Sequence, residues 1–258
     1  MPNKVLAAQL FTVRDYTQTP KDIAETLRKI AAIGYKSVQI SQFGAIDPHE
    51  VKSLLDEHGL SCGATHISYE RLKDDLPAVI AEHQLWGCRH VAIGSMPSAF
   101  RESGVDGVRN FATEANEIGF LLNQAGLTFS YHNHSFEFLR VNGRSLFEML
   151  FEELDPRYVF SELDTYWIQH GGGDPAAWIK ALSSRIPVIH LKDMVIHQNG
   201  QQIMAEVGEG NLNWPAILDA CRSSGTEIYA VEQDICQRDP FESLAISYRN
   251  LQAMGLKK

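Results

Sequence analysis

The sequence predicts an α/β protein, a single domain over residues 1–258 that folds as a closed (β/α)8 barrel. Eight short apolar runs alternate with eight helical segments along the chain. Strict alternation of strand and helix implies a parallel sheet, and eight such units in about 250 residues fit a closed barrel. Polar side chains follow directly after several strands, where a barrel of this kind places its active site. An open doubly wound sheet is the alternative, but no Gly-rich dinucleotide-binding turn follows the first strand.

Length, composition and charge narrow the class of protein further. A chain of 258 residues buries roughly three quarters of its unfolded surface, enough for one large core. The net charge of -9 and the lack of Lys/Arg clusters argue against a nucleic-acid partner. We expect no membrane partner, because no run approaches a transmembrane length and no apolar signal segment follows the start. Four scattered cysteines without a C-x-x-C pair predict free thiols and a cytoplasmic location: Cys62, Cys88, Cys221 and Cys236.

The first half of the chain contains four strand–helix units. Thr19-Pro20 and Asp47-Pro48 each supply an N-cap followed by a proline in the first helical turn. Pro77 falls in the middle of the third helical segment and weakens it there. The expected strands are Val5–Phe11, Ser37–Ser41, Ser61–Ile67 and His90–Ile93, and the expected helices are Thr19–Gly34, Asp47–Gly59, Tyr69–Trp86 and Val105–Gln124.

The second half repeats this alternation. Asp174-Pro175 marks the start of one helix after a glycine-rich loop. Asn199-Gly200 between alternating residues predicts a hairpin over Val195–Val207. The expected strands are Leu127–His132, Tyr158–Leu163, Pro187–Leu191 and Glu227–Glu232, and the other helices are Ser145–Leu154, Asn213–Ser223 and Asp239–Met254.

Three strand ends supply a candidate metal site. Alternate residues of a barrel strand point inward, and this phase ends on Asp164, His190 and Glu232 in the last three strands. The carboxyl ends of parallel strands meet at one mouth of the barrel, so these side chains are expected to converge. Two carboxylates and an imidazole suit one divalent ion such as Mn²⁺, Mg²⁺, Co²⁺ or Zn²⁺. The alternative is that each side chain satisfies a polar neighbour at the barrel rim.

The strand ends also resemble a known family. They read Tyr131-His-Asn-His-Ser-Phe-Glu137, Glu162-Leu-Asp164-Thr-Tyr-Trp167, Val188-Ile-His190-Leu-Lys-Asp193 and Val231-Glu232-Gln. These motifs resemble the xylose isomerase-like TIM barrels, the sugar phosphate isomerase/epimerase superfamily. In that superfamily a Glu, an Asp, a His and a second Glu from four successive strand ends hold one divalent metal. The resemblance implies Asp164, His190 and Glu232 as three of these ligands, with Mn²⁺ as the expected ion.

The first of the four ligands is where this sequence departs from the family. Members with simple epimerase activity carry a glutamate at the end of strand five, where this chain has Tyr131 or His132. We expect the nearest carboxylate, Glu137, to curl back onto the metal, with His132 as the alternative. The one that is not a ligand is then a candidate acid/base.

The resemblance implies a divalent-metal-dependent sugar isomerase or epimerase that acts through an enediolate. Glu232 is the expected base, with Glu137 or His132 as its partner. Lys192 is expected to stabilise the enediolate oxygen, although a surface ion pair with Asp193 is an equal alternative for it. The histidine-rich end of strand five also resembles the inosose dehydratases and 3-keto-glycoside lyases, so a dehydratase or lyase is the alternative function. A non-catalytic sugar-binding barrel or partner subunit is the second alternative.

We expect a small unphosphorylated sugar as the ligand. The Gly208–Asn211 loop precedes a helix and is a candidate phosphate cradle, but Glu206 and Glu209 would repel a phosphate. Whether the chain forms a homo-oligomer is left open. The side chains expected to bind the sugar are Gln9, Gln39, His66, His134, Trp167 and Asp193.

Overall fold

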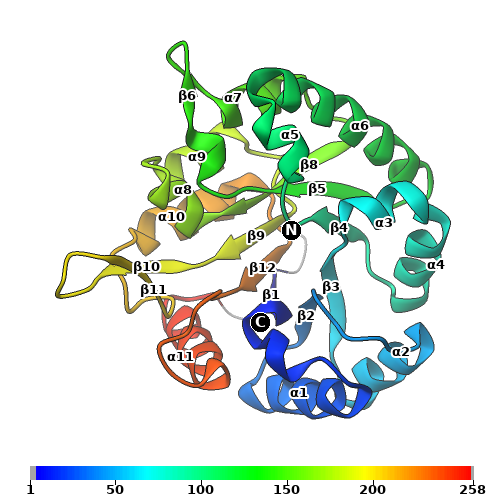
Figure 1. Cartoon of the computed structure of the whole chain (residues 1–258). Coiled ribbons are helices and arrows are strands. Elements are labelled where there is room, and N and C mark those ends of the chain that lie inside the picture. Colours follow the sequence, from blue (N-terminus) through cyan, green and yellow to red (C-terminus); the bar gives the residue numbers. More distant parts are fainter. Residues whose placement is uncertain (1–3, 257–258) are drawn as a thin grey trace.

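The computed structural model describes residues 4–256, in which eight parallel strands close into a barrel surrounded by helices (Figure 1). This confirms the expected (β/α)8 fold as a single domain. Around the barrel the strands follow the order β1, β12, β9, β8, β5, β4, β3, β2. Their bounds are Val5–Gln9 (β1), Ser37–Ile40 (β2), Ser61–His66 (β3), His90–Ile93 (β4), Thr128–His132 (β5), Val159–Asp164 (β8), Val188–Leu191 (β9) and Ile228–Val231 (β12).

Helices cover the outside of the barrel and connect its strands (Figure 1). The longer ones are α1 (Pro20–Ile33), α2 (Pro48–Glu57), α4 (Leu76–Trp86), α6 (Gly104–Gln124), α7 (Leu146–Glu153), α9 (Pro175–Ala181), α10 (Trp214–Ser224) and α11 (Pro240–Ala253). Short ones are α3 (Tyr69–Asp74), α5 (Ser98–Glu102), α8 (Thr165–His170) and the 3-10 helices η1 (Leu10–Tyr16) and η2 (Phe136–Phe138).

The capping residues recognised in the sequence begin their helices. The Thr19 hydroxyl accepts a hydrogen bond from the backbone N–H of Asp22 at 3.2 Å. Asp47 caps α2 and Asp174 caps α9 in the same way. Proline follows each of these caps without the loss of a helical hydrogen bond, because the first backbone N–H groups of a helix have no partner within it.

Two expected elements differ in the structure. The helix expected over Tyr69–Trp86 is divided at Asp75, whose φ of -142° and ψ of 38° are not helical. Pro77 lies in the first turn of α4 and has no N–H with which to continue α3, so the chain restarts there. The first strand ends at Gln9 rather than Phe11, because the Gln9 side chain accepts the N–H of Phe11 and caps η1.

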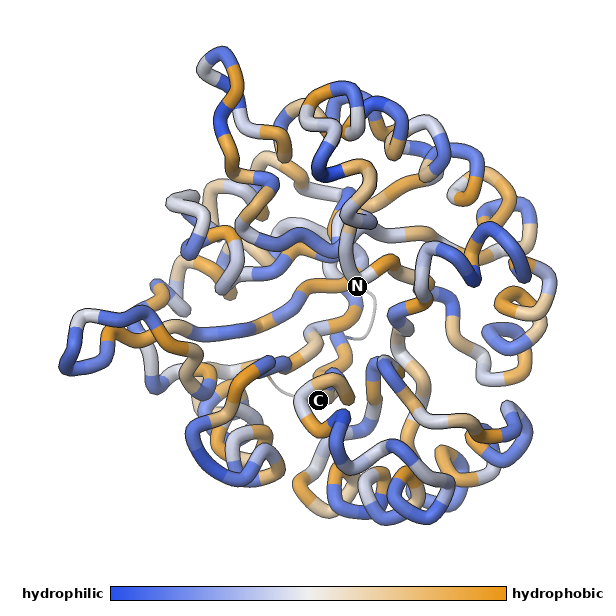
Figure 2. The backbone as a smooth tube through the Cα atoms, in the orientation of Figure 1, coloured by the Kyte–Doolittle hydropathy of each residue, from blue (hydrophilic) through white to orange (hydrophobic). Residues whose placement is uncertain are grey.

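The barrel interior changes from apolar to polar along the strands. Ala7, Ala64, Val188 and Ile228 form a small cluster inside the amino-terminal end. The main core lies outside the barrel, between the strands and the helices, whose orange and blue segments alternate in Figure 2. Polar side chains occupy the carboxyl-terminal end of the interior, so stability and chemistry are separated along the barrel axis.

Two hairpins extend from the barrel body (Figure 1). Strands β10 (Asp193–Ile196) and β11 (Gln202–Ala205) pair antiparallel around Asn199-Gly200, which confirms the expected hairpin. Strands β6 (Arg140–Val141) and β7 (Arg144–Ser145) form a second one. Its turn is Asn142-Gly143, both with positive φ. This Asn-Gly dipeptide is typical of a hairpin turn, although the hairpin is not among the elements predicted from the sequence.

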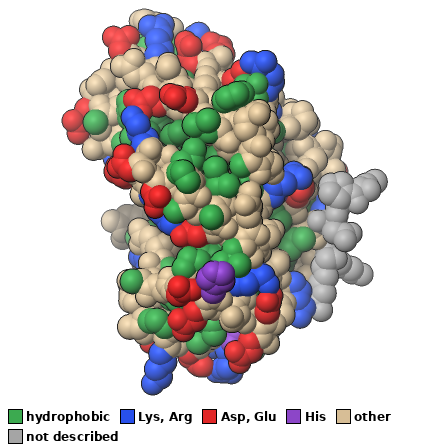
Figure 3. Space-filling model, turned by 90° about the vertical axis from the view of Figure 1, so that its right-hand side faces the viewer, with side chains coloured by type: hydrophobic (Ala, Val, Ile, Leu, Met, Phe, Trp, Pro, Cys, Tyr) green, Lys and Arg blue, Asp and Glu red, His purple; other side chains and the backbone are tan. Residues whose placement is uncertain are grey.

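The surface carries charges of both signs. On the face in Figure 3, acidic and basic side chains are interspersed with hydrophobic ones. Among residues 4–256, no helix is both long enough and apolar enough to cross a membrane.

Candidate active site

A pocket of about 760 Å³, here called the central pocket, lies at the carboxyl ends of the barrel strands. This is the end at which barrels of this kind carry their active sites. Its ionisable lining comes from several strand ends and includes His66, His132, His134, Lys192, Glu232 and Asp234.

Four side chains at the same strand ends, two of which line this pocket, form a group suited to a metal ion. One nitrogen or oxygen atom of each lies within 4.8 Å of the others. They come from β5, β8, β9 and the end of β12, which are neighbours in the barrel. The backbone register places Asp164 beside His190. The group consists of His132, Asp164, His190 and Glu232, all of them buried.

The two oxygens of Asp164 have different surroundings. Oδ1 accepts the backbone N–H of Trp167 at 2.9 Å and caps α8, while the Asn133 side chain accepts the N–H of Asp164 itself. Oδ2 is buried and makes no hydrogen bond of good geometry with the described residues; the Lys192 ammonium lies 3.0 Å from it and Nε2 of His132 lies 3.7 Å from it. Burial raises the pKa of this carboxyl to about 6. A buried carboxylate oxygen beside an imidazole is a ligand type that suits a divalent cation.

Lys192 lies among three carboxylates at the same place. Its Nζ is 2.6 Å from Oε2 of Glu232, 3.0 Å from Oδ2 of Asp164 and 2.9 Å from Oδ1 of Asp234. Burial disfavours its charge, but these carboxylates raise the pKa of Lys192 well above its usual value. Burial also disfavours the charge of Glu232, but Lys192 and His190 hold its pKa well below the usual range. The site therefore combines an ammonium group with an ionised carboxylate.

Glu162 forms a second layer beneath this group. Its carboxylate is fully buried and contacts Nε2 of His66, Nδ1 of His132 at 3.4 Å and Nε2 of His190 at 3.2 Å. The Gln39 amide donates to Glu162 at 2.7 Å, and its oxygen lies 2.7 Å from His190 Nε2. Glu162 is not among the site residues predicted from the sequence. Its inward phase, two residues before Asp164, was the available signal.

Glu137 lies apart from the metal-suited group. Its carboxylate accepts the hydroxyl of Tyr131 at 2.5 Å and the backbone N–H of His134 at 2.9 Å. Tyr131 points to the outside of the barrel, where its ring packs against Phe111, and it holds Glu137 on that side. The structure thus places His132, rather than the expected Glu137, with the other three side chains. Burial raises the pKa of Glu137 to about 7.

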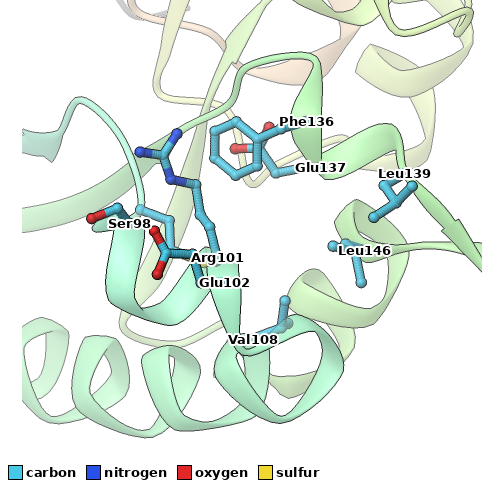
Figure 4. Close-up of a pocket in the computed structure, with 9 residues that line it drawn as sticks. Ser98, Arg101, Glu102, Val108, Phe136, Glu137, Leu139 and Leu146 are labelled. Carbon is cyan, nitrogen blue, oxygen red and sulfur yellow. The ribbon is translucent and has the colours of Figure 1, made fainter.

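Glu137 instead lines a second cavity of about 310 Å³, here called the side pocket (Figure 4). The side pocket lies between α5, η2, α6 and the start of α7. Figure 4 shows Arg101 and Glu102 on one side of it and Leu139 and Leu146 on the other.

The residues expected to bind the sugar fall into two groups. His66 and His134 line the central pocket, and burial lowers the pKa of His134 to about 3. Trp167 packs against His134 with ring centroids 5.2 Å apart, and its buried Nε1 has no partner in the described chain. Gln9 and Gln39 lie below, where they contact His66 and His190. Their amides are engaged by protein groups rather than directed at the pocket.

Asp193 lies away from the substrate-binding position expected for it from the sequence. It is fully buried, and its carboxylate accepts five donors that come from residues 194–214. These donors are the backbone N–H groups of Met194, Gly208, Gly210 and Leu212 and the indole N–H of Trp214. The loop that the sequence suggested as a phosphate cradle is thus wrapped around Asp193, and Asp193 forms no ion pair with Lys192.

Comparisons with known proteins agree with this architecture. A family model described as xylose isomerase-like TIM barrel matches residues 27–244. The chain is 23% identical over 198 residues to an inosose dehydratase of Geobacillus kaustophilus (strain HTA426). That match covers 66% of this chain and 61% of the dehydratase, so the chain spans less than two thirds of its relative.

Solved structures resemble the whole barrel. A sugar phosphate isomerase/epimerase from Parabacteroides distasonis ATCC 8503 superimposes with a TM-score of 0.81 at 25% identity, covering 100% of this chain and 96% of that one. An L-ribulose 3-epimerase has a TM-score of 0.70 at 15% identity, with 98% and 94% covered. The second likeness is one of fold alone.

Proposed function

Since the chain belongs to the xylose isomerase-like TIM barrel family, we propose that it is a metal-dependent enzyme that removes a carbon-bound proton beside the carbonyl group of a sugar. The observation that carries this proposal is the group of four ligand-type side chains at the central pocket, with the ammonium of Lys192 in contact with two of them.

We propose that His132, Asp164, His190 and Glu232 hold one divalent ion. The buried Oδ2 of Asp164, which makes no hydrogen bond of good geometry, and the mixed imidazole and carboxylate donors support this assignment. Two imidazoles favour Mn²⁺, Co²⁺ or Zn²⁺ over Mg²⁺, which prefers oxygen ligands. When bound, such an ion polarises the substrate carbonyl and makes the adjacent C–H more acidic.

The chain's own groups would then move the proton. Glu232 is our proposed base, because it faces the central pocket and its lowered pKa leaves it ionised and free of a proton. Lys192 would stabilise the negative charge that develops on the substrate oxygen. His66, on β3, lies three strands from β12, which Glu232 follows, in the barrel order, and its Nε2 is held by Glu162. That position makes His66 the candidate to return a proton from the opposite side.

We infer an unphosphorylated substrate. The backbone N–H groups of Gly208 and Gly210 donate hydrogen bonds to Asp193, so they are not available to a phosphate. The pocket lining also has more acidic than basic side chains, with Glu70, Glu232 and Asp234 against Arg101 and Lys192.

Isomerisation or epimerisation is the first outcome that we propose, since each requires a proton to be removed and returned. A dehydratase is the second candidate, because the named relative is an inosose dehydratase. The contact of Lys192 with Glu232 supports it as well, because elimination needs a proton donor for the departing hydroxyl beside the base.

The test is incubation of the metal-loaded protein in D₂O with a panel of ketoses and an inosose, followed by NMR. Deuterium at the carbon beside the carbonyl without loss of water indicates an isomerase or epimerase. Loss of water indicates a dehydratase. A protein that binds no metal and catalyses neither reaction would contradict the proposal and favour a non-catalytic sugar-binding barrel.

A further inference from the structure

The side pocket and the central pocket are neighbours. Met96 and Arg101 line both of them. His134 of the central pocket stacks on Phe136 of the side pocket, with centroids 6.0 Å apart and planes inclined by 16°. A molecule bound in one pocket can therefore extend past Arg101 into the other.

The deep walls of the side pocket are apolar. Val108 and Leu146 are buried there, Phe136 is half-buried, and Leu139 borders the opening with 62% of its surface exposed. The buried Glu137 offers it no free carboxylate oxygen, because Tyr131 and the backbone of His134 each donate to one. The other polar lining residues are Ser98, Arg101 and Glu102, and Figure 4 shows Arg101 and Glu102 on one side of the pocket. The opposite wall, with Leu139 and Leu146, offers no polar side chain to a sugar hydroxyl and suits a flat apolar group.

Arg101 lies at the junction of the two pockets. Its guanidinium is 4.8 Å from the centroid of the Phe136 ring, and it makes no ion pair within residues 4–256. A guanidinium in this position offers donors to a polar linking atom while its flat face covers an aromatic ring. The cavity of about 310 Å³ is at the small end of the range of ligand pockets, roughly 300–1,000 Å³, which suits one ring.

We propose that the side pocket binds a phenyl-sized aromatic group attached to the sugar, so that the substrate class is an aryl-substituted sugar with a carbonyl group, such as an aryl glycoside whose sugar ring carries a ketone. This inference rests on the proposed function only for the sugar in the central pocket. The side pocket itself is tested without turnover.

The probes are phenol, phenyl β-D-glucopyranoside and methyl β-D-glucopyranoside, with binding to the full chain measured by calorimetry and saturation-transfer NMR. Val108→Trp fills the side pocket, and Leu139→Asp places a charge at its exposed edge, where folding is not at risk. Leu121→Trp is the matched control, because Leu121 lies on the same helix α6 with 44% of its surface exposed and lines neither pocket.

Phenol should bind the wild type and Leu121→Trp, and its affinity should fall about tenfold in Val108→Trp and measurably in Leu139→Asp. The phenyl glucoside should bind the wild type about tenfold more tightly than the methyl glucoside, a preference that both pocket variants should lose. No phenol binding to the wild type, no preference for the phenyl glucoside, or unchanged phenol affinity in both pocket variants would overturn the proposal.

These outcomes are separate from those of the proton-exchange assay. If phenol binds as expected but no sugar exchanges its proton, the side-pocket assignment stands and the proposed reaction fails. If sugars exchange but phenol does not bind, only the side-pocket inference is overturned.

Discussion

The ammonium nitrogen of Lys192 lies 2.6 Å from Oε2 of Glu232, with both groups buried at the mouth of the barrel. Asp164 and Asp234 complete the surroundings of this nitrogen. A buried cation among three carboxylates favours their ionised form and opposes the effect of burial. The same contact places a proton-bearing group directly beside the proposed base.

Replacing Lys192 with Met should slow deuterium exchange of the sugar about 10²- to 10³-fold, because it removes the charge that stabilises the developing oxyanion. Metal content should not fall, because the variant loses a competing cation rather than a ligand. Elemental analysis and NMR exchange rates on the same sample check both points. A metal-loaded variant that exchanges at the wild-type rate would show that Lys192 serves only to balance charge.

Replacing Glu232 with Gln should retain part of the bound metal, since the amide still offers an oxygen. Exchange of the carbon-bound proton should fall by about 10² to 10⁴, the usual effect of losing one positioned base. The measurement is exchange rate per bound metal ion. An unchanged rate per ion would restrict Glu232 to a ligand role and move the base to His132 or His66.

Glu137 predicts a pH dependence of stability. Its pKa is raised from 4.5 to about 7 in the folded protein, so its contribution is fully present below pH 4.5 and is lost as the pH rises through 7. A glutamine at this position does not ionise, so the Glu137→Gln variant does not lose this stability as the pH rises. The free energy of unfolding of the variant minus that of the wild type should therefore rise by about 3 kcal/mol between pH 4.5 and pH 8. Urea denaturation at both pH values checks this, and a difference independent of pH would contradict the buried neutral carboxyl.

Asp193 should be a structural residue. Asp193→Ala leaves several buried N–H groups without an acceptor and should lower the free energy of unfolding by at least about 3 kcal/mol. Asp193→Asn keeps one acceptor oxygen and should lose less. Chemical denaturation of the two variants gives the comparison. A stable Asp193→Ala protein with weakened sugar binding would instead support the substrate role expected from the sequence.

The fold and three of the four grouped side chains followed from local patterns. Period-two phase along a strand specifies which residues point inward, and a parallel barrel brings the strand ends together. Asp164, His190 and Glu232 are grouped by these rules alone. Their role as metal ligands remains a proposal.

Strand phase and barrel geometry do not predict the position of Glu137. It follows the last strand residue, His132, by five positions, so its direction depends on the turn of η2 and on its bond to Tyr131. That bond joins two side chains outside the barrel, and strand phase does not reveal it. The hydrogen bonds from the Gly208–Leu212 loop to Asp193 also join residues that are distant in the sequence, and strand phase does not predict them.

Metal content of the His132→Ala and Glu137→Ala proteins, measured beside the wild type, tests the proposed centre most directly. The account predicts about one divalent ion per chain in the wild type and in Glu137→Ala, and a loss of most of it in His132→Ala. Full metal content in His132→Ala together with loss in Glu137→Ala would contradict the assignment of the metal site.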